Sequence, residues 1–122
     1  MKTEVIKKNN IEVVVVNSNE LLITDVQSAL DLIMSLKYGT GCTNIAVNKN
    51  AIINDFFILS SCLAGDILQK FINYGVRFAI YGDFSKYTSK PLKDFMYESN
   101  QGKNIYFQPT ASLAVDKLCG CA

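Results

Sequence analysis

The sequence predicts an α/β fold with a mixed five-stranded sheet, and three observations support this. Residues 44–83 read strand, helix, strand, with two short apolar runs at 45–47 and 76–81 that do not alternate with polar residues. Such runs are typical of parallel strands, which helices cover on both faces. A run of four valines at 13–16 adds a strongly β-branched strand near the N-terminus.

The N-terminal residues predict a β-hairpin. Residues 4–8 and 11–16 read as two strands, separated by Asn9 and Asn10. Asn tolerates positive φ, so this pair suits a two-residue turn between antiparallel strands. We therefore expect the first two strands to be antiparallel and the second to be buried on both faces.

The first helix is expected to begin near Thr24. Gln27 follows Thr24 at the spacing of a capping box, and an apolar stripe with helical period follows over residues 26–34. Gly39 and Gly41 are expected to end this helix.

The second helix is predicted over residues 60–74. Gly65 inside it costs about 1 kcal/mol relative to Ala, which predicts close packing against a neighbour, and Cys62 is expected to be a small core residue. Residues 50–58 connect the preceding strand to this helix. Phe56 and Phe57 in the connector either pin it onto the sheet or form an exposed patch, and we favour pinning.

The C-terminal third predicts a helix, a strand and a last helix. Ser89 precedes a helix with Pro91 in its first turn, residues 104–108 form a strand, and Thr110 caps the final helix. The strands after the hairpin should be parallel, with right-handed crossovers. If consecutive strands are neighbours, every crossover helix lies on one face. The other face is then covered, dimeric or only partly apolar.

The composition indicates one domain, residues 1–122, with a substantial core. Hydrophobic residues make up 49 % of the chain and charged residues 19 %, below the roughly 25 % typical of soluble domains. Either the protein is compact with little charged surface, or another chain covers part of it. The net charge of +1 argues against nucleic acid or an anionic membrane as a partner.

The chain contains no histidine, which excludes Ser-His-Asp and Cys-His catalysis and removes the usual nitrogen ligand of zinc. We therefore expect no metal site and no cofactor. Cys119 and Cys121 supply two of the four ligands that zinc needs, and we interpret them as exposed thiols of a frayed end. The N-terminus lacks a secretory apolar region and no apolar run approaches about 20 residues, so we expect a cytoplasmic protein with reduced cysteines.

Polar residues end the predicted parallel strands: Asn17, Asn48, Asp83 and Gln108. Ligands of open α/β sheets bind at the carboxyl ends of strands, where helices also begin. The best candidate site for a ligand or partner is therefore a polar rim, formed by Asn17, Asn48, Ser60 and Asp83. Turn geometry alone also places such residues after buried strands.

Four segments, residues 22–32, 63–71, 82–87 and 93–100, carry a family resemblance that extends over nearly the whole chain. Together they resemble a bacterial family classified as domain of unknown function 4180. This resemblance implies no activity.

More distantly, the layout is similar to that of STAS domains, the anti-sigma-factor-antagonist fold. That resemblance implies a module that binds protein partners and is switched by phosphorylation at a helix start, within a motif that is roughly Asp-Ser-Ser-Gly-Leu-Gly. Ser60 would match the phosphoacceptor. Leu59 stands where the motif has its acidic residue, and Cys62 stands where it has glycine.

The leading functional hypothesis is a non-enzymatic regulatory or scaffold protein that binds a protein partner or a second copy of itself. It rests on the lack of catalytic motifs, the low charge and the STAS-like layout. The alternative is a small-molecule-binding protein or a weak enzyme that uses the polar rim.

Overall fold

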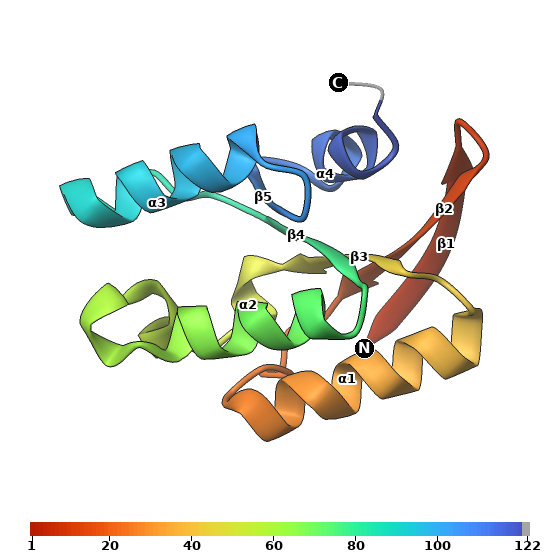
Figure 1. The fold of residues 1–122 in the computed structure, drawn as a ribbon, viewed down its shortest axis with the longest axis horizontal. Helices are drawn as coiled ribbons and strands as arrows, with labels where there is room; N and C mark the ends of the chain where they lie inside the picture. Colours follow the sequence, from red (N-terminus) through yellow and green to blue (C-terminus); the bar gives the residue numbers. More distant parts are fainter. Residues whose placement is uncertain (121–122) are drawn as a thin grey trace.

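The computed structural model describes residues 1–120, and five strands form one sheet whose spatial order follows the chain (Figure 1). β1 is antiparallel to β2, and all other neighbours are parallel. The predicted α/β fold with a mixed five-stranded sheet is therefore confirmed. The strands are β1 (Lys2–Lys8), β2 (Ile11–Asn17), β3 (Asn44–Asn48), β4 (Arg77–Tyr81) and β5 (Ile105–Gln108).

Within residues 1–120, four helices flank the sheet: α1 (Val26–Thr40), α2 (Leu63–Asn73), α3 (Lys90–Gln101) and α4 (Ala111–Leu118). The first three connect parallel strands and contribute buried side chains to one core, which also contains alternate residues of β2 to β5. The single-face arrangement is the expected result of right-handed crossovers between neighbouring strands.

On the opposite face of the sheet, α4 packs over β2 to β5. Ala114, Val115 and Leu118 of this helix pack with Val13, Ala46, Ala79 and Tyr106 in a second, smaller core. The strands alternate side chains between the two cores, as the pleat requires. Of the three possibilities expected for this face, the structure shows the first over β2 to β5, where a helix of the chain itself covers the sheet.

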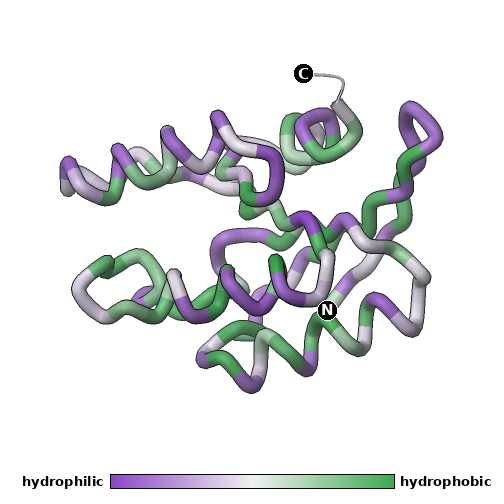
Figure 2. Tube along the Cα trace, in the orientation of Figure 1, coloured by the Kyte–Doolittle hydropathy of each residue, from purple (hydrophilic) through white to green (hydrophobic). Residues whose placement is uncertain are grey.

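The β1–β2 hairpin has the predicted two-residue turn. Asn9 and Asn10 have φ angles of 54° and 62°, and Lys8 is paired with Ile11. Two consecutive left-handed residues define a type I′ turn, whose twist matches that of the strands. Figure 2 shows that the tip of this hairpin is hydrophilic.

The start of α1 differs from the prediction by one residue. Asp25, not Thr24, is the N-cap: the Ser28 N–H donates to Asp25 Oδ1 at 2.8 Å, and the Asp25 N–H donates to Ser28 Oγ at 3.0 Å. The capping box is therefore Asp25–Ser28. The helix continues through Gly39 and ends at Gly41, which has a φ of 74°.

The predicted start of α2 at Ser60 is wrong, because residues 59–61 form a 3₁₀ turn (η3, Leu59–Ser61) and α2 begins at Leu63. Cys62 has a φ of 61° and is exposed, so its predicted place in the core is also wrong. Close packing does not explain Gly65, since nothing lies within 4 Å of the position a Cβ would take.

The connector between β3 and α2 is packed onto the sheet. It contains two more 3₁₀ turns, η1 (Lys49–Ala51) and η2 (Asn54–Phe57). Phe56 and Phe57 are 1 % and 5 % exposed, and Phe57 stacks on Tyr87 with ring centroids 4.9 Å apart. The pinning role predicted for the two phenylalanines is confirmed.

The C-terminal cysteines are only partly described. Cys119 is buried at the end of α4 and directs its thiol toward the carbonyl of Ile11 at 3.8 Å, so the prediction of an exposed thiol is wrong for this residue. Cys121 lies outside the described residues. Within residues 1–120, no helix combines the length and apolar character that crossing a membrane requires.

Candidate functional site

The carboxyl ends of β2, β3 and β4 surround a hollow of about 320 Å³, which we call the rim hollow. Three of the predicted rim residues line it together: Asn17, Asn48 and Asp83. The other lining residues are Lys49, Asn50, Tyr81, Gly82 and Lys86. The two lysines were missed in the sequence, although Lys49 directly follows the polar residue that ends β3.

Asn48 joins the ends of two strands. Its side-chain amide donates to the Ser18 carbonyl at 2.7 Å, and its Oδ1 accepts from the Ser18 N–H at 2.9 Å. Asn48 is buried, so these bonds satisfy groups that would otherwise be costly to bury. The amide that the sequence assigns to a ligand is therefore engaged with the backbone.

Asp83 is exposed at the mouth of the rim hollow. Its carboxylate accepts from the Ser85 N–H at 2.9 Å. Hydrogen bonds from the Ser85 side chain and backbone, helped by the positive charges of Lys49 and Lys86, lower the pKa of Asp83. A carboxylate with a lowered pKa is a weaker base, so this environment suits an anchoring charge better than a proton acceptor.

Because Gly82 has no side chain, the Lys49 side chain can pack against its backbone. Gly82 has a φ of 152°, and a Cβ there would lie 2.9 Å from the Cβ of Lys49. The Lys49 ammonium lies 4.8 Å from the centroid of the Tyr87 ring, a cation–π arrangement. The rim therefore has a fixed cation beside Asp83.

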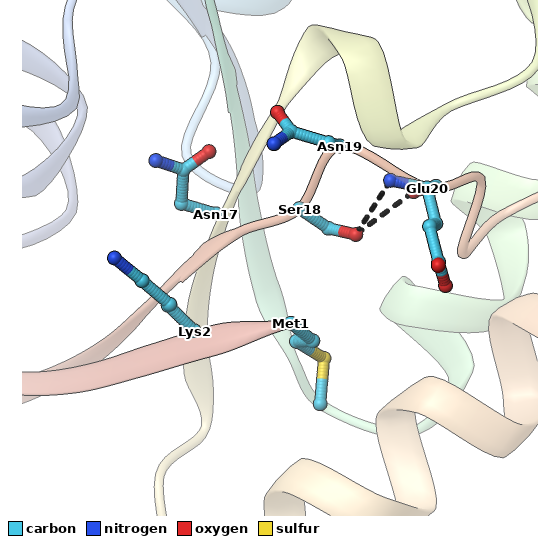
Figure 3. A pocket seen from close by; sticks show the side chains of 6 residues that line it. All are labelled: Met1, Lys2, Asn17, Ser18, Asn19 and Glu20. Carbon is cyan, nitrogen blue, oxygen red and sulfur yellow. Dashed lines mark hydrogen bonds between the residues drawn. The ribbon is translucent and has the colours of Figure 1, made fainter.

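A second hollow, of about 340 Å³, lies between the start of β1 and the segment that follows β2 (Figure 3). Ser18 Oγ donates to the Glu20 carbonyl at 2.9 Å and accepts from the Glu20 N–H at 3.0 Å, which folds this segment back on itself. Figure 3 shows Lys2 and Asn17 on the same side of the ribbon, as their paired register requires.

A third and larger hollow, of about 640 Å³, lies on the α4 side of the sheet, and we call it the α4-face groove. It is lined by Lys2, Thr3, Glu4, Val15, Asn17, Tyr81 and Ala111. Asn17 lines all three hollows, so they meet at the end of β2. The sequence did not indicate this groove, because no crossover rule fixes the position of a helix after the last strand.

Ser60 does not line the rim hollow. It is exposed in η3, and the N-cap of α2 is Cys62, which makes no side-chain capping bond. Ser89 and Thr110, by contrast, cap α3 and α4 as expected. In the described part of the chain, no three His, Cys, Asp or Glu side chains group as a metal site would need.

Comparisons with known proteins identify a family but no activity. The family model described as "Domain of unknown function (DUF4180)" matches residues 8–118. No curated protein and no solved structure matches the chain.

Proposed function

The chain belongs to the DUF4180 family, and we propose that it is a non-enzymatic regulatory or scaffold module that binds a protein partner. The α4-face groove is the surface that we assign to this partner. The observation that carries the proposal is that α4 leaves the part of the sheet next to β1 uncovered, as a hollow of about 640 Å³.

The lining of the groove suits a protein segment. Its floor is apolar, with Val15, Ala111 and the Tyr81 ring, while Lys2 and Glu4 on β1 carry opposite charges along one wall. An apolar floor beside a charged wall is the usual arrangement of a protein interface, in which buried contacts give affinity and peripheral charges give specificity. The fitting partner presents apolar side chains flanked by charges of both signs.

The topology also favours a partner over a substrate. Small ligands of open α/β sheets bind where strand order reverses and a crevice opens between crossovers on opposite faces. In this sheet the strands follow chain order and the three crossover helices share one face. The resemblance to STAS domains, which act through protein partners, agrees with this proposal and stays a prediction.

Site-specific photo-crosslinking in the native host tests the proposal. A photoreactive residue at Lys2 in the groove should capture one defined protein, whereas the same residue at Tyr97, exposed on α3, should not. The captured protein is then purified and its affinity measured by calorimetry. Equal capture at both positions would contradict the proposal.

A matched pair of variants completes this test. Ala111→Glu places a carboxylate in the groove at the first residue of α4, where an acidic side chain suits the helix dipole. It should weaken binding at least about tenfold, or 1.4 kcal/mol. Leu113→Glu, at an exposed position of the same helix outside the groove lining, should leave the affinity unchanged.

The rim hollow supports a second candidate function, the binding of a small anion. Lys49 and Lys86 place two positive charges at this hollow, against the single negative charge of Asp83, and Asn17 adds an amide. A thermal-shift screen of small carboxylates and phosphates tests it. Stabilisation that disappears in Lys86→Ala, which removes a positive charge, and persists in Asp83→Ala, which removes a negative charge, supports this candidate. A library without a stabilising compound counts against it.

Phosphorylation of Ser60 is a regulatory proposal that rests on the STAS resemblance. Ser60 is exposed in η3, where a kinase could reach it. Mass spectrometry of protein purified from its native host under varied growth conditions should then detect a modified fraction. A residue that is always unmodified would retire the proposal.

A further inference from the structure

β1 is a long strand at an open edge of the sheet. It contains seven residues and is paired with β2 on one side, at the end of the strand order. The opposite edge, β5, has four residues, and the Asn100 side chain accepts from the Phe107 N–H at 2.8 Å. An exposed edge presents backbone donors and acceptors in the pattern that another strand requires.

The turn geometry identifies which backbone groups point outward. In a two-residue hairpin the residues that flank the turn, Lys8 and Ile11, exchange hydrogen bonds, and such pairs alternate with unbonded ones. The even-numbered residues of β1 therefore bond to β2. Thr3, Val5 and Lys7 direct their N–H and C=O groups to the open edge, and the Val5 side chain is 48 % exposed.

We propose that a second copy of the chain adds to this edge, with the two β1 strands antiparallel and Ile6 facing Ile6 across a two-fold axis. The result is a continuous ten-stranded sheet. This inference goes beyond the proposed function, because the second copy binds at the β1 edge and leaves the α4-face groove free for the partner.

The charges of β1 select this register. Outward-bonding residues lie opposite each other only when one β1 strand is shifted along the other by an even number of residues. Three registers of this kind pair at least five residues of each strand. One sets Glu4 against Glu4, and another sets Lys2 against Lys8 twice. The third sets Glu4 against Lys8 twice, with Ile6 on the axis. Like charges directly opposite are destabilising and unlike charges are favourable, so the third register is preferred.

The same charges explain why the edge is selective. Lysines on an edge strand discourage indiscriminate pairing. Lys8 is also held by Asp116 of α4 at 2.8 Å, which keeps its side chain on the α4 side of the sheet, where Glu4 lies as well. A strand without a carboxylate opposite Lys8 would lack this favourable pair.

The two-fold axis has a consequence for the α4-face groove. An axis perpendicular to the sheet keeps the same face of both copies on the same side. Both α4 helices then lie on one side, and the two grooves, each bordered by its own β1, lie on either side of the axis. The dimer therefore presents two partner-binding grooves on the same face, one on each side of the axis.

Light scattering of the purified full-length chain tests the dimer, with two substitutions at one residue as a matched pair. Val5→Pro removes an N–H that points to the open edge, so no hydrogen bond to β2 is lost. Proline is tolerated at such positions of edge strands. It should give a monomer, while Val5→Thr, which keeps the N–H, should stay dimeric. Circular dichroism melting checks that both variants fold.

Disulfide trapping tests the register. In a Cys62→Ser, Cys121→Ser background, Ile6→Cys should form an intermolecular disulfide on oxidation, because this position faces itself in an unbonded pair. Val5→Cys should not. Trapping at Val5 in place of Ile6 would overturn the register.

The two proposals fail separately. A folded wild-type chain that stays monomeric at near-millimolar concentration overturns the dimer, whereas capture at Lys2 of a protein other than this chain tests binding in the groove. If the chain is monomeric and a photoreactive residue placed at Val5 captures a different protein, a strand of that protein occupies the edge and the dimer is overturned. A dimer that survives Val5→Pro would place the contact elsewhere.

Discussion

The Tyr81 hydroxyl donates a hydrogen bond of 2.7 Å to the backbone carbonyl of Val16, and so connects β4 to β2 across the intervening β3. Tyr81 thereby forms a wall shared by the rim hollow and the α4-face groove. The two candidate surfaces are linked through this one side chain, so a change at Tyr81 should affect both.

Replacing Tyr81 by Phe should lower the free energy of unfolding by about 1 kcal/mol, because the ring remains and one partly buried hydrogen bond is lost. Chemical denaturation at neutral pH measures this difference. Tyr97→Phe, at a more exposed position on α3, is the control and should change the free energy of unfolding by less than about 0.5 kcal/mol.

The stability contributed by Tyr81 should also depend on pH. Burial raises the pKa of Tyr81 above its ordinary value of 10.0. The folded state then holds this proton more tightly than the unfolded state, so the contribution of Tyr81 to stability is constant below pH 10 and falls as the pH rises further. The wild type should lose stability above this pH more steeply than Tyr81→Phe. Parallel pH profiles for the two proteins would contradict the shift.

Asn48 and Asn17 should respond differently to the same substitution. Asn48→Ala removes two buried hydrogen bonds and leaves the Ser18 N–H and C=O without these partners. The free energy of unfolding should fall by about 2–3 kcal/mol. Asn17→Ala, at an exposed residue of the same rim, should stay within about 0.5 kcal/mol. Equal effects in urea unfolding would show that the Asn48 amide is not structural.

Gly82 and Gly65 provide a second contrast. Gly82→Ala forces a positive φ on alanine and a contact with Lys49, so we expect a loss of about 1–3 kcal/mol. Gly65→Ala introduces a better helix former into open space and should increase stability by up to about 1 kcal/mol. Thermal unfolding of both variants measures the signs, and destabilisation by Gly65→Ala would indicate a contact that the packing does not show.

Asp25 should make stability sensitive to acid. Hydrogen bonds from the Ser28 backbone and side chain lower the pKa of Asp25 below 3.8. The contribution of its charge is therefore present above this pH and disappears as the pH falls through the lowered value. Asp25→Asn should melt at a lower temperature than the wild type at pH 7, and the difference should shrink in acid. A difference that does not change with pH would contradict this prediction.

The sheet could be predicted because its signals are local. The four valines of β2, the turn at Asn9 and the apolar runs of β3 and β4 each determine an element without reference to the rest of the chain. The exact start of each helix depends on which of several neighbouring residues becomes the N-cap. Ser60 resembles an N-cap, yet the chain makes a 3₁₀ turn there and enters α2 through Cys62 in a left-handed conformation.

The candidate site was harder to predict, because its chemistry depends on register. The sequence placed Asn17, Asn48 and Asp83 at strand ends, and these residues do line one hollow. It could not indicate that the Asn48 amide bonds to Ser18, since this requires the alignment of β2 with β3. The α4-face groove depends on where a terminal helix packs, which no local pattern encodes.

The chain-order sheet has a consequence for how the protein is made. Every strand pairs with its predecessor, so no strand has to insert between two others, and each pairing closes only the segment that joins it to the previous strand. These closures cost less loop entropy than pairings between strands farther apart in the chain would cost. During synthesis the hairpin emerges before the βα units that follow it, and each of these units is added on the side away from the outer edge of β1. The edge that the proposed dimer uses is therefore complete before the rest of the sheet has formed.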